Sequence, residues 1–425
     1  MCVYYNWVED PTYVTLDPWE LPITDVNFPA IDICNVNKLS KWKAQELAEK
    51  IHSYFNNEAY SVVLRYVKLL GNMYDFSLHG SNNFARLQNI LDQFLNGTDL
   101  AVLLLKLMVP CDEMLQKCEW NSVEYDCRNL FRVRLSDGGF CCSFNQIQPI
   151  LRPEIYGASE AHYHLPKTSK KFEGSELNNG LTVTISNNLS DYFYTTLATR
   201  GVTIKVFLPT DFPDVSSGSL REVIVKEQSE VFIKLEPYSL RSQDTIRAMP
   251  QSLRKCKFAD EENIGFGLYS SSNCYVSCKI KSILSLCKCI PFMFPKIKVE
   301  KNNLRYCNVI DIPCLNKYQH KILRYYPTED PDNPELAFEL EDSLKCHCIP
   351  NCDDVIYDVD VHEIEYFGGD SGNKLTQSIF TIRIFGGILS LFLGISVMSF
   401  IEILLLIFKL ISLKIYKLLH SENKN

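Results

Sequence analysis

The sequence predicts an α+β fold: a large disulfide-rich domain, followed by one membrane-spanning helix near the C-terminus. Three observations predict this. Segments with strand-like alternation are interleaved with segments of helical periodicity. Ten of the 17 cysteines lie between residues 256 and 352, and an apolar stretch covers 385–408. The 425-residue chain is long enough to bury a sizeable core, and its net charge of −8 argues against a nucleic-acid partner.

The first predicted elements are a short strand within 27–37 and a helix that begins after Ser40. Ser40 is a suitable N-cap, and the apolar residues that follow it recur at helical spacing. The apolar stretch 101–109 is too short to span a bilayer, so a buried helix is predicted there. Further strands are predicted by β-branched runs bounded by turn residues, at 181–186, 202–209 and 221–226.

The cysteine-rich region favours disulfide bonds in an oxidising compartment. The alternative is a zinc module, but the two Cys-x-Cys pairs fit the usual ligand spacing poorly and few histidines lie nearby. The odd total leaves one thiol over, for which Cys2 is the candidate. The predicted disulfide cysteines are Cys256, Cys274, Cys278, Cys287, Cys289, Cys307, Cys314, Cys346, Cys348 and Cys352.

Two glycosylation acceptor triplets agree with an extracellular domain, although such triplets also arise by chance. They begin at Asn96 and Asn188.

An acidic strand is predicted shortly before the membrane helix. Residues 353–370 contain seven acids and no Lys or Arg, and apolar and acidic residues alternate from Val355 to Val361. The alternation then slips, which predicts a bulge near His362. The acids either form a solvated strand face or concentrate cations at a pore entrance. The candidate vestibule acids are Asp358, Asp360, Glu363 and Glu365.

The predicted membrane helix, 379–408, differs from a plain anchor. Gly386, Ser390, Gly394, Met398 and Glu402 recur every four residues and share one stripe of a helix. Small residues on a stripe allow close helix packing, which a dimerising anchor would also use. An acid inside a span is costly and faces a partner or water. Physical chemistry therefore favours a pore helix over a packing anchor.

The basic residues that follow the span orient it. By the positive-inside rule, the basic tail 409–425 is expected in the cytosol and residues 9–378 outside the cell. The lysines of the tail are Lys409, Lys414, Lys417 and Lys424. No signal peptide is recognisable at the N-terminus, so we expect an upstream membrane segment, of which residues 1–8 would be a remnant. The span has no repeated arginines, so no voltage sensor is expected.

Several motifs together resemble the degenerin and epithelial sodium channel family, most closely its insect pickpocket branch. They are "FPAIDICNVN" from Phe28, "GFCCSFN" from Gly139, the cysteine spacing from Cys274 to Cys352, and "GGILSLFLGISVMSFIE" from Gly386. The family places threonine where this chain has Asp32. The chain also lacks the family's cytosolic His-Gly motif.

The resemblance implies a hand-like extracellular domain with palm, β-ball, finger, knuckle and thumb, the thumb covering about residues 256–350. It also implies a homo- or heterotrimer in the plasma membrane, with two membrane helices per subunit. Such a channel conducts Na⁺ passively and is blocked by amiloride. Its partners would be subunits of the same family, permeant Na⁺ and membrane lipids.

The resemblance assigns roles within the last span. Gly394, Ile395 and Ser396 would form the selectivity filter, and Glu402 would attract cations in the inner pore. Arg383, Gly386, Gly387 and Ser390 would lie in the outer pore near the blocker site. Arg383 stands where many relatives have a small residue, so gating by this chain is not predictable.

Two other classes of function remain open. A single-pass cysteine-rich receptor or adhesion protein would explain the disulfides and glycines but not Glu402 or the acidic strand. The other is a truncated, non-conducting channel subunit that assembles with full-length partners and regulates them. An enzyme is not expected, because the common catalytic and phosphate-binding motifs are absent and the eight histidines form no evident constellation. No cofactor, metal site or catalytic residue is predicted.

Overall fold

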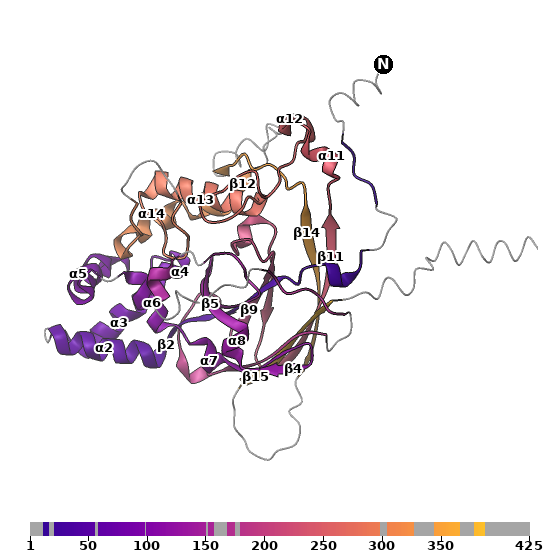
Figure 1. Cartoon of the computed structure of the whole chain (residues 1–425). Helices are drawn as coiled ribbons and strands as arrows, with labels where there is room; N and C mark the ends of the chain where they lie inside the picture. The colour runs from indigo at the N-terminus through magenta and orange to yellow at the C-terminus, as the bar shows by residue number, and fades with distance from the viewer. Residues whose placement is uncertain are drawn as a thin grey trace, which may run out of the picture. The chain divides into compact units, whose positions relative to one another are not determined.

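A five-stranded and a six-stranded sheet carry the central core of the computed structural model (Figure 1). The structure describes residues 12–16, 21–55, 58–97, 99–149, 152–156, 168–174, 179–297, 304–326, 344–365 and 378–386. The described residues all belong to one compact unit that ends at Gly386. The mixture of helices and strands confirms the α+β prediction for this part of the chain.

The five-stranded sheet is antiparallel throughout, and β1 lies at its centre. Its strands, in spatial order, are β10 (Arg221–Val225), β9 (Val202–Phe207), β1 (Ala30–Asn35), β6 (Gly139–Phe144) and β5 (Phe131–Ser136). The strands β1, β9 and β10 lie in segments where the sequence predicts strands.

The six-stranded sheet brings together distant parts of the chain. In spatial order its strands are β14 (Asp354–Glu365), β11 (Ser229–Leu240), β15 (Ser378–Gly386), β7 (Gly180–Asn187), β3 (Leu115–Trp120) and β4 (Val123–Tyr125). Only the β11–β15 pair is parallel among these neighbours. Two short ribbons complete the described strands: β2 (Asn37–Ser40) with β8 (Tyr192–Thr195), and β12 (Tyr325–Tyr326) with β13 (Leu344–Lys345).

One hydrophobic core is built from strands of both sheets. Ile31 and Ile33 of β1, Val183 of β7, Ile233 of β11 and Ile382 of β15 are fully buried in it. Phe28 packs edge-on against Trp120 with 4.9 Å between ring centroids, and joins the segment before β1 to β3. Apolar residues alternate with polar ones along these strands, which places one face of each in the core.

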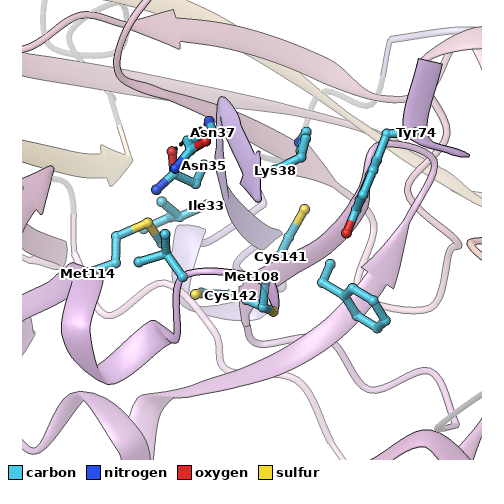
Figure 2. Close-up of a pocket in the computed structure, with 11 residues that line it drawn as sticks. Ile33, Asn35, Asn37, Lys38, Tyr74, Met108, Met114, Cys141 and Cys142 are labelled. Carbon is cyan, nitrogen blue, oxygen red and sulfur yellow. Dashed lines mark hydrogen bonds between the residues drawn. The ribbon is translucent and has the colours of Figure 1, made fainter. Parts of the chain in front are cut away.

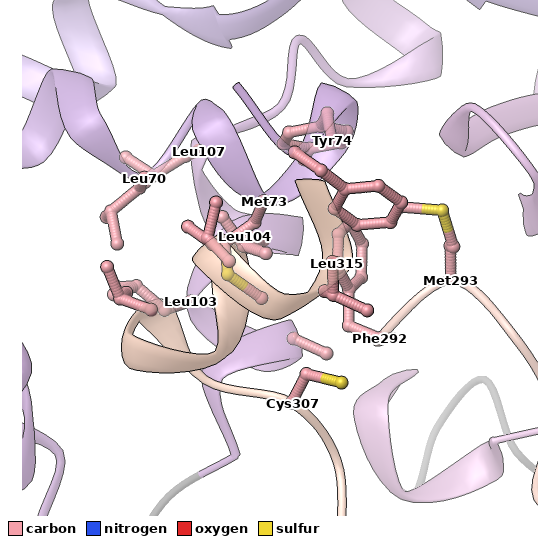
Figure 3. Close-up of a cluster of buried hydrophobic side chains, with 14 of the residues drawn as sticks. Leu70, Met73, Tyr74, Leu103, Leu104, Leu107, Phe292, Met293, Cys307 and Leu315 are labelled. Carbon is pink, nitrogen blue, oxygen red and sulfur yellow. The ribbon is translucent and has the colours of Figure 1, made fainter. Parts of the chain in front are cut away.

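The helices form a second core. Figure 3 shows Leu70 and side chains of α4 (Asn72–Asp75) and α6 (Leu100–Leu107) packed against Phe292, Met293 and Leu315, so the first and last thirds of the chain share this core. The longer helices are α2 (Lys41–Phe55), α3 (Tyr60–Leu69), α5 (Phe84–Leu95), α6 (Leu100–Leu107) and α13 (Ser271–Cys287).

Shorter helical elements link these segments. The α-helical ones are α4 (Asn72–Asp75), α7 (Cys111–Met114), α8 (Cys127–Leu130), α9 (Pro153–Tyr156), α11 (Asp244–Arg247), α12 (Gln251–Arg254), α14 (Ile312–Lys317) and α15 (Gln319–Leu323). The 3₁₀ turns are η1 (Ile23–Asp25), η2 (Ser81–Asn83), η3 (Leu189–Asp191), η4 (Val215–Ser217) and η5 (Val309–Asp311).

The first two predicted helices are confirmed. Ser40 precedes α2, and its hydroxyl oxygen accepts a hydrogen bond from the Lys43 amide at 3.3 Å, as expected of an N-cap. The apolar stretch at 101–109 forms the buried helix α6.

In the described part of the chain, no single helix has the length and apolarity needed to cross a membrane. The segments Ser81–Leu95 and Leu100–Met114 meet those criteria only when counted together, and they meet at a bend of 93°.

Candidate functional site: the sheet before the predicted pore

The predicted acidic strand is β14, at the edge of the six-stranded sheet. It pairs with β11 in unbroken register from Asp354 opposite Leu240 to Glu365 opposite Ser229. The predicted bulge near His362 is therefore wrong. Continuous pairing with the equally long β11 holds β14 straight, although its apolar pattern changes phase.

This regular pairing divides the candidate vestibule acids between two faces. Asp358 and Asp360 alternate with Tyr357 and Val359, whose side chains point into the core. Because successive side chains of a strand point to opposite faces, Glu363 lies on the other face from Asp358 and Asp360. Its carboxylate is 3.3 Å from the Lys226 ammonium. The described acids thus do not form a single cluster.

Asp358 and Asp360 belong to a mixed charged face. Glu236 of β11 is directly opposite Asp358, and Lys234 is directly opposite Asp360. Lys234 forms an ion pair with Glu236 at 2.5 Å, and this hydrogen bond raises the pKa of Lys234. His362 Nε2 lies 3.3 Å from Asp360. The face is net acidic, but its central cation is already paired within the sheet.

Arg383 lies in β15, between β7 and β11. Its Nε donates to Glu230 Oε1 at 3.0 Å, and its guanidinium lies 5.8 Å from the centroid of the Phe232 ring. The sequence did not predict this partner, because Glu230 is 153 residues away along the chain. The sequence indicates this ion pair only through the presence of an acid, Glu230, at the start of the β11 segment.

The structure differs here from the predicted helix over 379–408, because its first residues belong to β15. The segment is rich in β-branched residues, and Ile382 and Ile384 are buried on one face with Arg383 on the other. This is the alternation of a strand. Gly386 ends β15, while Gly387, Ser390, Gly394, Ile395, Ser396 and Glu402 lie outside the described residues, as do residues 1–8 and the tail 409–425.

The predicted disulfide cysteines are all paired, which favours disulfides over zinc. Their bonds are Cys256–Cys352, Cys274–Cys348, Cys278–Cys346, Cys287–Cys314 and Cys289–Cys307. Three further disulfides hold the earlier part of the chain: Cys34–Cys141, Cys111–Cys142 and Cys118–Cys127. Cys2 is the seventeenth cysteine and lies outside the described residues.

The two glycosylation candidates are both exposed. Asn96 follows α5 in a left-handed conformation. The Asn188 carboxamide oxygen accepts from the Ser190 amide at 3.1 Å and from the Ser190 hydroxyl at 2.7 Å, which forms a tight turn within the triplet.

A row of polar side chains crosses the five-stranded sheet, and the sequence did not predict it. Asp32 of β1 is directly opposite Ser143 of β6 and Lys205 of β9, and the Ser143 hydroxyl donates to Asp32. Lys205 forms an ion pair with Asp137. Burial raises the pKa of Asp32 to about 7. The Asp32 of the "FPAIDICN" motif is therefore a buried, mostly neutral acid below that pH.

The fold and its eight disulfides define a disulfide-stabilised α+β domain of the kind built for oxidising surroundings. The model of the amiloride-sensitive sodium channel family matches residues 1–384. The chain therefore belongs to the amiloride-sensitive sodium channel family, whose members are ion channels and not enzymes.

Curated relatives come from the same family. Pickpocket protein 28 of Drosophila melanogaster is 26% identical over 358 residues, which cover 75% of this chain and 52% of the relative. Sodium channel protein Nach of Drosophila ananassae is 23% identical over 432 residues, 94% of this chain and 76% of the relative. The chain thus spans about half the length of the pickpocket relative and about three quarters of the Nach relative.

Proposed function

We propose that this chain is a subunit of a sodium channel in the plasma membrane, assembled as a trimer with identical or related subunits. The observation that carries the proposal is the family match over residues 1–384. Relatives described as sodium channel proteins align over nearly the whole chain, which supports it. The pore would be blocked by amiloride, as the family description suggests, and insensitive to voltage, because the proposed span has no repeated arginines.

The proposed pore follows β15. In this proposal a membrane helix lies within 387–408, with Gly394, Ile395 and Ser396 as the filter. Backbone carbonyls and a serine hydroxyl can replace the hydration shell of Na⁺. Glu402 would then attract cations below the filter, and Gly386, Gly387 and Ser390 would line the outer pore. Arg383 would stand at the entrance, with Glu230 as its counter-charge.

The acids of β14 would contribute unequally to such a channel. Asp358 and Asp360 share a face with Glu236, so they are the better candidates for concentrating cations. Glu363 lies on the other face and is paired with Lys226. Residues 9–378 would lie outside the cell with the tail 409–425 inside, and the disulfide-rich segment of about 256–350 would form the thumb.

Electrical recording tests this function. The natural gene product that contains this chain, expressed in oocytes, is expected to pass an inward Na⁺ current at negative voltage that amiloride blocks. Replacing Ser396 by tryptophan should abolish the current, and Glu402→Gln should reduce it, because each removes a group proposed to contact the ion. Glu422→Gln, a change of the same type beyond the span, is the matched control.

Surface expression of every variant must be measured by biotinylation, so that loss of current is not loss of protein. A protein that reaches the surface and never conducts, alone or with a pickpocket subunit, would favour the receptor reading. One that alters a partner's current without adding its own would favour the regulatory-subunit reading.

A further inference from the structure

A groove beside α13 is large enough to hold a small organic molecule. Its volume is about 360 Å³, a size typical of ligand pockets in proteins. One wall is a face of α13, and segment 345–348 lines the other. By contrast, the pocket beside Lys38 and Cys141 has a volume of about 10 Å³, which leaves room for about one water molecule (Figure 2). The groove beside α13 is therefore the better candidate for a ligand site.

Two disulfides hold the walls of this groove together. Cys274 and Cys278 lie about one turn apart on α13 and bond to Cys348 and Cys346, with Cα atoms 5.7 and 6.0 Å apart. The Cys278 Sγ also lies 3.8 Å from the Lys345 carbonyl oxygen. The second wall is thus fixed along the helix by covalent bonds. A ligand would meet a groove that is already formed, which reduces the entropy lost on binding.

The α13 wall carries hydroxyl groups and one positive charge. Ser277, Lys281 and Ser285 recur every four residues, so they share one face of the helix, and all three line the groove. The helix contains no Asp or Glu. Its other lysine, Lys279, is buried and paired with Asp214 at 2.8 Å, whereas Lys281 is exposed. Lys281 is therefore the charge that α13 presents to the groove.

The opposite wall adds two basic side chains. Lys345 and His347 both line the groove and are exposed. In the described part of the chain, neither of them forms an ion pair, and nor does Lys281. Glu262 is the one acid among the described residues that line the groove, and its carboxylate is paired with Lys257. With two unpaired lysines, the groove has a net positive charge.

These features select a ligand with negatively charged oxygen atoms. Ammonium groups and serine hydroxyls can donate to carboxylate, phosphate or sulfate oxygens, and hydrogen bonds between charged groups are strong. We propose that this groove binds a small organic anion with at least two such groups, held by Lys281 on one wall and Lys345 on the other. Ile264 and Tyr269 also line the groove and offer apolar surface to the carbon atoms of the ligand. This binding does not depend on the proposed sodium conduction.

Chemical labelling of lysines tests the site on the unaltered full chain. An N-hydroxysuccinimide ester acetylates accessible lysines, and mass spectrometry gives the rate at each position. Pyrophosphate and citrate are the probes, with sodium chloride at equal ionic strength as the control for screening. At least one probe should slow the acetylation of Lys281 and Lys345 and leave that of the exposed Lys41 unchanged. Protection by pyrophosphate alone would indicate a phosphate ligand, and protection by citrate alone a carboxylate.

Variants measure the contribution of each lysine. In calorimetric titrations, Lys281→Gln and Lys345→Gln should each lower the affinity for the protecting probe about tenfold, the effect of losing one charged hydrogen bond. Lys41→Gln should leave the affinity unchanged. All three residues are exposed, so these changes should not prevent folding.

Three results would overturn the proposal. The first is that neither probe protects the two lysines of the groove, and the second is that Lys41→Gln loses as much affinity as the other variants. The third is slow acetylation of Lys281 and Lys345 before any probe is added, because the chain itself would then fill the groove.

Discussion

Arg383 of β15 and Glu230 of β11 are joined by a hydrogen-bonded ion pair at 3.0 Å, although neither residue is more than about a third exposed. The pair places a neutralised arginine three residues before the last described residue, Gly386. The charge at the proposed pore entrance is therefore set by two strands, not by Arg383 alone.

Removing the counter-charge tests this relationship. Glu230→Gln should reduce inward Na⁺ current, by less than about fivefold, because a partly exposed ion pair is worth at most about 1 kcal/mol. The double variant Glu230→Gln with Arg383→Gln should restore the current. Current amplitude and single-channel conductance are the measurements. Glu363→Gln, on the other face of the sheet, is the control, and an equal loss in that variant would show that position on the sheet is irrelevant.

Asp32 predicts a pH dependence of stability. Loss of solvent on burial raises its pKa in the folded state from 3.8 to about 7, and outweighs the opposing effects of the Ser143 hydrogen bond and the Lys205 and Arg134 charges. The folded chain therefore holds a proton that the unfolded chain releases between these values. The free energy of unfolding consequently loses a contribution as pH rises from about 4 to 7, and loses no more above that range.

Asp32→Thr, the residue usual at this place in the family motif, should remove this contribution. The variant should be more stable than the parent at pH 8, by on the order of a few kcal/mol, and the difference should shrink towards pH 4. Chemical denaturation at a series of pH values measures it. Asp211, whose burial also raises its pKa to about 7, is present in both proteins, so its effect cancels in the difference. A difference between the two proteins that stays constant with pH would contradict this assignment.

Arg152 predicts a large loss of stability on truncation. It is fully buried, pairs with Asp99, donates to the Phe292 carbonyl at 2.9 Å and stacks 3.5 Å from the centroid of the Tyr306 ring. Arg152→Met should lower the free energy of unfolding by about 2–4 kcal/mol, because the carboxylate and carbonyl lose a charged donor. Arg128→Met, which breaks an exposed pair with Asp112, should cost less than about 1 kcal/mol. Urea unfolding compares them, and similar costs would argue against the role of burial.

Asn96 and Asn188 predict that the domain carries glycans. Both side chains are exposed, so a transferase could reach them if the domain enters the secretory pathway. Asn96→Gln and Asn188→Gln should each increase gel mobility by one glycan, and the double variant should match the protein treated with glycosidase. Asn263→Gln, an exposed asparagine outside any acceptor triplet, should leave mobility unchanged. A parent protein that is insensitive to glycosidase would contradict the proposed topology.

Local patterns could be predicted wherever neighbours in sequence decide the structure. Ser40 capped its helix and the alternation from Val355 identified a strand, because both depend on residues a few positions apart. The cysteine spacing predicts that these cysteines form disulfide bonds. Which cysteine pairs with which depends on how the folded chain brings distant segments together. The alternation also suggested a bulge near His362, which the pairing with β11 overrides.

The remaining features depend on contacts between distant segments. The local sequence places Arg383 in a predicted apolar span, because no nearby residue indicates that β7 and β11 lie on either side of it. Asp32 departs from the family motif, but its burial beside Ser143 and Lys205 depends on the pairing of β1 with β6 and β9.

The Cys256–Cys352 bond closes the segment between β11 and β14, whose ends, Leu240 and Asp354, face each other in the sheet. Four more disulfides lie inside that closed segment. A protease that cuts once between residues 257 and 351 would consequently release no fragment, and the cleaved protein would migrate as a single species until it is reduced. Any effect of extracellular cleavage there would have to come from greater mobility of the cut segment, because the disulfides keep both sides of the cut joined.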